Sequence, residues 1–298
     1  MSFALTSPIR SRAVTGMMLM CASMLCFSIM NTAIRYTSAE VPSFLMVFWR
    51  NVWGVVILLP WLLHAGVKGL HTTRYRAHLV RAACGVIAME LWFYALFLLP
   101  VAEAVALSFI TPIFVTIGAS LILHEKVGRG TWLAVALGFI GVLIIARPGT
   151  AVFGPGAVFV LCSSCAMATS GLLVKALSRT ESAPRTVFYM NANMMVISAP
   201  LAYMYWQPVS WEMQGMLLIV AVSSSAAHFC MIGAFKFADV KTVIPFDFTR
   251  LVFTAILAYL VFGEVLDFWT AIGAAIIMAG SIYAGRREAR LEKEIANG

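Results

Sequence analysis

The chain has 298 residues, of which 61% are apolar and only 11% are charged. Soluble globular domains carry about 25% charged residues, so this chain has too few charges to cover a water-facing surface of its size. The composition excludes an ordinary soluble protein and predicts that lipid surrounds most of the molecule. The net charge of +8 would suit a nucleic-acid-binding protein, but the placement of the basic residues argues against that partner.

The first apolar run follows Arg10 and Arg12 and extends to Tyr36. A basic stretch before an apolar run is also typical of a signal peptide. This run is long enough to cross a bilayer, so we interpret it as the first transmembrane helix.

Ten segments reach or approach the roughly 20 apolar residues that cross a bilayer core. They lie at residues 14–36, 42–64, 77–98, 100–123, 130–147, 155–177, 184–206, 213–237, 240–262 and 267–285. Pro148-Gly149 and Gly154-Pro155-Gly156 mark the middle loop. We therefore predict an all-α membrane protein of ten transmembrane helices, divided into residues 14–147 and 155–285.

The basic residues gather on one side of the membrane if the chain starts inside and alternates. Seventeen of the 21 Lys and Arg residues then lie inside, two lie outside, and two fall within helices. Because basic residues accumulate in cytoplasmic loops, both termini are predicted to be cytoplasmic. The net charge then faces the cytoplasm and anionic lipid headgroups, and nucleic acid is not required as a partner.

An internal repeat becomes visible when the chain is shifted by 139 residues. Residues 95–141 then lie over 234–280, and Glu125 meets Glu264 at the same helix end. Each half contains five helices, an odd number, so the second half enters the membrane from the opposite side. Inverted repeats of this kind are typical of transporters, whose substrate site lies near the midplane between the halves.

Several short motifs occur in a characteristic order: Phe48-Trp49-Arg50, Thr111-Pro112, Glu125 and Phe262-Gly263-Glu264. With the repeat and the helix count, they make the chain resemble the drug/metabolite transporter superfamily, in particular its EamA-type members, over residues 14–285. The resemblance implies a secondary transporter of the bacterial inner membrane that uses alternating access and needs no cofactor.

The resemblance points to two kinds of substrate. Overall size and arrangement are similar to bacterial aromatic amino acid exporters. Residues 244–251, where Leu251 replaces the counterpart of Pro112, are instead similar to transporters assigned to S-adenosylmethionine or other metabolites. The first prediction is therefore export of an amino acid with an aromatic or bulky apolar side chain, and the alternative is uptake of S-adenosylmethionine or another metabolite.

Charged residues inside apolar helices cost about 2.5–3.5 kcal/mol at the helix centre, so they indicate function or a specific partner. Arg50 and Asp247 lie near the midplane, and Arg250 shares a helix face with Asp247. Arg50 or Arg250 could bind a carboxylate, and Asp247 an ammonium group or a proton. The alternative is a structural Asp247–Arg250 pair, with Arg50 bonded to helix-end carbonyls. Glu90 is interpreted as structural.

Aromatic residues near these charges could hold a flat or aromatic substrate, and His228 could titrate near neutral pH. Packing or lipid contact is the alternative role for each of them. The candidate substrate-binding residues are Arg50, Asp247, Arg250, Trp49, Trp53, Phe246, Tyr94, Tyr189 and His228.

Small residues recur at four-residue spacing in the last helix of each half: Gly130, Ala134 and Gly138, then Ala271, Ala275 and Ala279. Such stripes permit close packing within the bundle or in a homodimer. A membrane-embedded enzyme is the main rival class, but the chain has no H-E-x-x-H motif, paired intramembrane aspartates or Walker A motif. We predict neither catalysis nor a metal site, and Cys162 and Cys165 are interpreted as small buried side chains.

Overall fold

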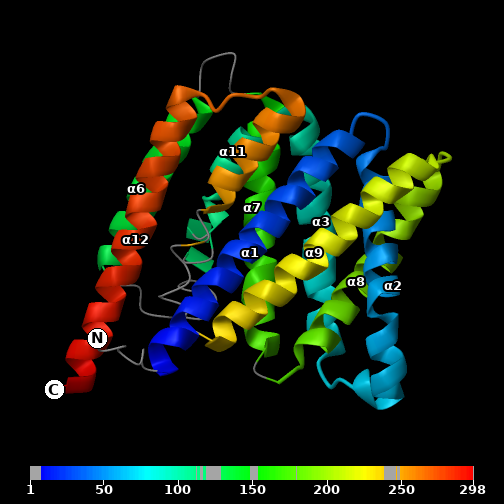
Figure 1. Ribbon diagram of the computed structural model, residues 1–298, viewed down its shortest axis with the longest axis horizontal. Helices are drawn as coiled ribbons and strands as arrows, with labels where there is room; N and C mark the ends of the chain where they lie inside the picture. Colours follow the sequence, from blue (N-terminus) through cyan, green and yellow to red (C-terminus); the bar gives the residue numbers. More distant parts are fainter. Residues whose placement is uncertain are drawn as a thin grey trace, which may run out of the picture.

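The described part of the computed structural model comprises residues 8–111, 113–114, 117–118, 129–147, 154–178, 180–237, 246 and 249–297, and its regular structure is entirely helical. The elements are α1 (Pro8–Thr37), α2 (Ser43–Gly69), α3 (Tyr75–Leu98), α4 (Val101–Ser108), α6 (Arg129–Ala146), α7 (Pro155–Ser178), α8 (Ala183–Met204), α9 (Trp211–Phe237), α11 (Thr249–Phe262) and α12 (Phe268–Asn297). They form the bundle of Figure 1, in which neighbouring helices cross at moderate angles.

The helices follow the apolar runs of the sequence. Five helices in the described ranges are long and apolar enough to cross a membrane, within α1, α2, α3, α7 and α9. Shorter apolar stretches lie at Ala136–Ile145, Thr249–Phe262 and Phe268–Gly280. The all-helical, multi-span prediction is thus confirmed, whereas the number of ten spans stays a prediction. Regular geometry in α2 breaks at Gly66, with a φ of 61°, close to the predicted end at residue 64.

The most extensive helix contacts keep their pattern when the first five described helices are exchanged, in order, with the last five. The contact of α1 with α9 becomes that of α7 with α3, and the contact of α1 with α11 becomes that of α7 with α4. The contact of α3 with α8 becomes that of α9 with α2. The pairs α2–α8, α4–α11 and α6–α12 map onto themselves. Two similar halves related by an approximate two-fold axis would pack in this way.

The core of the bundle surrounds α4, whose residues are almost all buried. Phe93 and Leu96 of α3, Leu45 of α2 and Phe109 after α4 are among its largest buried side chains. Large apolar side chains are exposed on the outward faces of α6, α11 and α12. Lipid is the natural solvent for such a surface.

The contact between α6 and α12 depends on two glycines. A Cβ atom at Gly141 would lie 2.6 Å from the carbonyl oxygen of Gly273, and a Cβ at Gly273 would lie 2.6 Å from the carbonyl oxygen of Gly141. The two backbones therefore approach closely at this point. The second predicted stripe, Ala271, Ala275 and Ala279, is exposed.

Candidate functional site

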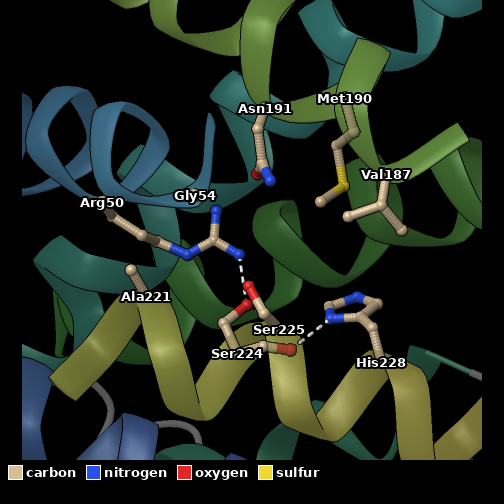
Figure 2. Close-up of a pocket in the computed structure, with 9 residues that line it drawn as sticks. All are labelled: Arg50, Gly54, Val187, Met190, Asn191, Ala221, Ser224, Ser225 and His228. Carbon is tan, nitrogen blue, oxygen red and sulfur yellow. Dashed lines mark hydrogen bonds between the residues drawn. The ribbon is translucent and has the colours of Figure 1, made fainter. Parts of the chain in front are cut away.

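A narrow pocket lies between α2 of the first half and α8 and α9 of the second half (Figure 2). In this conformation the side chains leave no room in it for a water molecule. Each helix contributes residues at helical spacing, so one face of each helix turns toward the pocket. The lining residues are Arg50, Gly54, Val187, Met190, Asn191, Ala221, Ser224, Ser225 and His228.

Arg50 supplies the positive charge of the pocket. It is only 5% exposed, and its Nη2 donates to the Ser224 hydroxyl at 2.5 Å. Nη1 lies 3.3 Å from Oδ1 of Asn51 and 3.2 Å from the sulfur of Met89. All these partners are neutral, and among the described residues no carboxylate lies within ion-pair distance of Arg50. A buried guanidinium held in this way can accept an anionic ligand group as its counter-ion.

His228 presents a defined ring nitrogen to the same pocket. Its Nδ1 lies 2.8 Å from the carbonyl oxygen of Ser224, and a carbonyl only accepts hydrogen bonds, so Nδ1 carries a proton. In the neutral ring Nε2 is then an acceptor, available to a ligand N–H or O–H group. Phe27 packs edge-on against the ring at 5.2 Å between centroids, which fixes its orientation.

Asn191 and Ser225 add polar groups that are free to bind a ligand. In the described part of the chain, neither side chain has a hydrogen-bond partner, although both are buried. Figure 2 shows the Asn191 amide directed into the space beside the Arg50 guanidinium. Gly54 makes room for it, because a Cβ atom there would lie 2.7 Å from Nδ2 of Asn191. The pocket thus combines one cation, one acceptor nitrogen, an amide and hydroxyl groups.

Of the predicted site residues, the structure brings Arg50 and His228 to this pocket. Arg250 lies elsewhere: its Nη2 donates to the Ser108 hydroxyl at 3.1 Å, and its guanidinium stands 5.3 Å from the Phe109 ring centre. It therefore links α11 to α4. Asp247 lies outside the described residues.

The predicted aromatic residues do not form one wall, because helical spacing turns them to different faces. Trp49 packs against Trp206, and Trp53 donates from Nε1 to Gln214 at 3.2 Å. Tyr94 is half exposed and contacts Phe97 and Phe159. Phe246 joins a small cluster with Met20, Met24 and Ala234, and Tyr189 belongs to a polar network at one end of the bundle.

Several residues of interest were missed or misplaced by sequence reasoning. The face formed by Ala221, Ser224, Ser225 and His228 has helical spacing, a signal that could have identified the pocket side of α9. Arg81 is one of the seventeen basic residues that the charge pattern assigns to the inside; it is only 6% exposed, and its Nη1 donates to the Thr186 carbonyl at 3.0 Å. Arg81 therefore points into the bundle from the second turn of α3, which the charge pattern alone did not indicate.

The comparison with protein families identifies the two halves. The EamA-like transporter family matches residues 14–147 and again residues 154–285. Together these ranges cover most of the chain.

Three curated relatives cover nearly the whole chain. An S-adenosylmethionine uptake transporter of Rickettsia prowazekii is 30% identical and covers 88% of this chain and 89% of its own length. A riboflavin transporter of Vibrio cholerae is 31% identical, covering 97% and 99%. A pseudopaline exporter of Pseudomonas aeruginosa is 27% identical, covering 91% and 96%.

The fold also occurs among solved structures. One crystal structure superposes with a TM-score of 0.66 at 17% identity, covering 94% of this chain and 99% of that chain. This similarity shows a shared fold.

Proposed function

The chain belongs to the EamA-like transporter family, a family of transporters rather than enzymes, and from this premise we propose that it carries a small organic solute bearing a carboxylate. The solute would bind in the pocket between α2, α8 and α9. Transport would be secondary, across the inner membrane, and would need no ATP-hydrolysing part in this chain.

The observation that carries this proposal is the position of Arg50. It is a buried cation with neutral partners, and it stands between two sequence halves in a pocket with unpartnered polar groups. A carboxylate would form charge-assisted hydrogen bonds with the guanidinium, which are about twice as strong as neutral ones. Asn191, Ser225 and Nε2 of His228 would then contact the polar remainder of the solute.

Among the candidate solutes we place S-adenosylmethionine first. It carries an amino-acid carboxylate for Arg50 and a flat base with N–H groups, and one relative is named for its uptake. A free amino acid also carries a carboxylate, but the three relatives described are named for other solutes. Riboflavin has no carboxylate and would leave the charge of Arg50 without a counter-ion.

Transport would proceed by alternating access, with residues 14–147 and 155–285 as inverted repeats that move against each other. The exchange symmetry of the helix contacts supports this arrangement. Binding pockets for small molecules usually measure about 300–1,000 Å³, whereas this pocket has no room for a water molecule, so it must widen to hold the solute. Separation of α2 from α8 and α9 would widen it. Asp247 stays the proposed residue for proton coupling or for binding an ammonium group.

Purified protein in proteoliposomes tests the proposal with labelled S-adenosylmethionine, riboflavin and phenylalanine, each with and without a pH gradient. We expect flux of S-adenosylmethionine that falls at least about tenfold in Arg50→Ala, because the charged contact is lost. Arg76→Ala, at an exposed arginine, is the matched control and should transport normally. Flux of riboflavin alone, unaffected by Arg50→Ala, would contradict the carboxylate assignment.

A further inference from the structure

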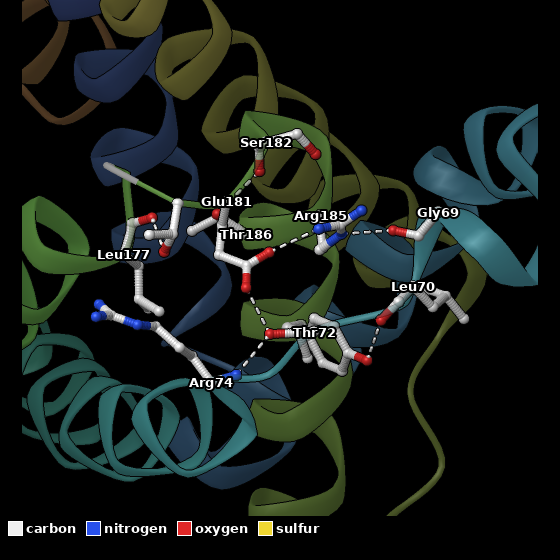
Figure 3. A network of polar contacts seen from close by, with 11 residues as sticks. Gly69, Leu70, Thr72, Arg74, Leu177, Glu181, Ser182, Arg185 and Thr186 are labelled. Carbon is white, nitrogen blue, oxygen red and sulfur yellow. Dashed lines mark hydrogen bonds and ion pairs between the residues drawn. The ribbon is translucent and has the colours of Figure 1, made fainter.

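A polar clasp joins the two halves at one end of the bundle (Figure 3). We call this the basic end; it holds the α2–α3 loop, residues 70–74, and the α7–α8 segment, residues 180–185. The Thr72 hydroxyl donates to Oε1 of Glu181 at 2.5 Å, and Arg185 donates to Oε2 of Glu181 at 2.8 Å. Nε of Arg185 also donates to the Gly69 carbonyl at 2.6 Å. Glu181, whose side chain is 3% exposed, thus anchors a contact between the halves.

The clasp is built on the helices that line the pocket. Gly69 ends α2, which also carries Arg50 and Gly54. Tyr189 of α8 donates to the Leu70 carbonyl at 2.7 Å, and its neighbours Met190 and Asn191 line the pocket. Movement of α8 away from α2 at this end would therefore break the clasp and open the pocket together.

His78 shows that the closed clasp carries an energetic cost. Its ring is 1% exposed and stacks on Tyr189 at 4.8 Å between centroids, and both ring nitrogens lack a hydrogen-bond partner among the described residues. A buried polar group without a hydrogen-bond partner is unfavourable, because it loses its contact with water and gains nothing in return. If the clasp opened, water would hydrate the ring. The unpartnered ring therefore lowers the free-energy cost of opening.

A corresponding contact lies at the opposite end of the same helices. Exchange of the two halves maps the α2–α3 and α7–α8 loops onto the α8–α9 and α1–α2 loops. There Gln207 donates to the Glu40 carbonyl at 2.9 Å, and Phe44 stacks on Tyr205 at 5.2 Å. This contact has no ion pair among its described residues and is more exposed than the clasp.

We propose that these two loop pairs are the two gates of the pocket, and that the hydrogen bonds of Glu181 hold the gate at the basic end closed. Opening toward the basic end breaks the Thr72–Glu181 and Arg185–Gly69 contacts while the Glu40–Gln207 gate stays closed. Opening toward the other end does the reverse. The inference rests on the proposed transport function, because a gate has meaning only for a pocket that is reached from both sides.

The gate can be tested by thiol accessibility, without any solute. Met190→Cys places a thiol in the pocket, in a background whose six native cysteines are replaced. A membrane-impermeant thiol reagent is then added to vesicles of each orientation, and Thr73→Cys in the exposed loop identifies which side is the basic end.

We expect Glu181→Gln to raise the alkylation rate from the basic side roughly tenfold, because the closed state loses a charge-assisted hydrogen bond. Thr72→Val removes the other partner of the same contact and should act in the same direction if Glu181→Gln fails to fold. Glu212→Gln, at an exposed carboxylate in the first turn of α9, is the matched control and should leave the rate unchanged.

Opening of the second gate should change the alkylation rate from the opposite side of the membrane. Gln207→Ala should raise the alkylation rate from the side opposite the basic end and leave the basic-side rate unchanged. Folded Glu181→Gln and Thr72→Val proteins with wild-type basic-side rates would overturn the gate. Absence of S-adenosylmethionine flux with the expected thiol reactivity would count against the proposed solute and leave the gate intact.

Discussion

At the scale of single residues, the most informative side chain is Arg50, because its structural and functional roles predict opposite changes in stability. If Arg50 were half of a buried ion pair, removal would strand the partner charge and destabilise the protein by about 3–5 kcal/mol. The described partners are neutral: the Ser224 hydroxyl, the Asn51 amide and the Met89 sulfur. Replacement by an apolar side chain should then relieve a desolvation cost.

We therefore expect Arg50→Met to unfold at the same temperature as the wild type or higher, while solute binding is lost. Thermal unfolding in detergent and equilibrium binding measure the two effects separately. Arg50→Lys keeps the charge without the planar fork and should bind more weakly than the wild type but better than Arg50→Met. A large fall in the melting temperature of Arg50→Met would instead identify a structural ion pair.

Glu181 predicts how the basic-end gate responds to pH. Burial raises the pKa of the Glu181 carboxyl. The hydrogen bonds from Thr72 and Arg185 and the charge of Arg185 lower it by more, so the net pKa lies below its ordinary value. The closed gate therefore binds a proton less readily than the open gate. The contribution of ionised Glu181 to the stability of the closed gate is complete above the ordinary carboxyl pKa, near 4.3. It is lost as the pH falls through the lowered pKa.

Basic-side alkylation of the Met190→Cys protein should accordingly show no Glu181-dependent change between about pH 6 and 8, and should rise below about pH 4.5. Rates are compared with Glu181→Gln at each pH, which cancels the ionisation of the thiol itself. His78, Arg185 and Tyr189 lie close enough to the carboxylate to interact with it, and of these only histidine ordinarily titrates near pH 6.5. A pH-dependent change that persists in Glu181→Gln would not belong to Glu181.

At the scale of helices, the sequence revealed charged residues within apolar runs more readily than it revealed which side chains of different helices contact each other. Arg50 stands out because it interrupts an apolar helix, and it does line the pocket. Ser224 and Ser225 do not stand out, since serine is common in membrane helices. Gly54 could not be identified from α2 alone, because its role is to leave space for Asn191 on α8. The burial of Arg81 could not be predicted, because residues near a helix end can point either inward or to water.

The packing of α6 on α12 predicts a sharp difference between two glycines. Gly273→Ala would place a methyl group 2.6 Å from the Gly141 carbonyl oxygen and 2.5 Å from the Ile145 side chain. Because a backbone atom cannot move aside, we expect a loss of about 1–3 kcal/mol of stability. Gly171 of α7 has open space around its Cβ position, so Gly171→Ala should change stability little. Denaturant or thermal unfolding compares them, and equal stabilities would contradict the close contact.

At the scale of the whole molecule, the sequence repeat predicted two similar halves but not the residues at which they contact each other. The order of apolar runs and the odd number of helices per half predicted two similar halves, and the most extensive helix contacts have the expected exchange symmetry. The alignment could not say which residues meet. It pairs Gly141 with Gly280, whereas Gly141 faces Gly273 in the bundle. Packing between antiparallel helices depends on where the helices cross. Aligning one half of the sequence with the other gives equivalent positions but not the crossing point.

The placement of the loops makes a strong prediction about membrane topology. Thr72 meets Glu181 at the basic end, which joins the α2–α3 and α7–α8 loops. The opposite end joins Glu40 to Gln207, and Arg147 pairs with Asp267 at 2.5 Å beyond the ends of α6 and α11. Loops that contact each other must lie on the same side of a bilayer. Ten crossings satisfy both sets of contacts at once, with the loops alternating between the two ends.

We therefore expect reporter fusions after Thr72 and at the C-terminus to be cytoplasmic, and fusions after Gln207 and Asp267 to be periplasmic. The excess of Lys and Arg in the basic-end loops sets this orientation, because basic loops are retained in the cytoplasm. The shorter apolar stretches of α6, α11 and α12 are the critical cases. If α12 did not cross, the Asp267 and C-terminal fusions would report the same side. If α11 did not cross, the Asp267 fusion would be cytoplasmic and the C-terminal fusion periplasmic. A periplasmic C-terminus together with a cytoplasmic Thr72 fusion would overturn the ten-helix topology.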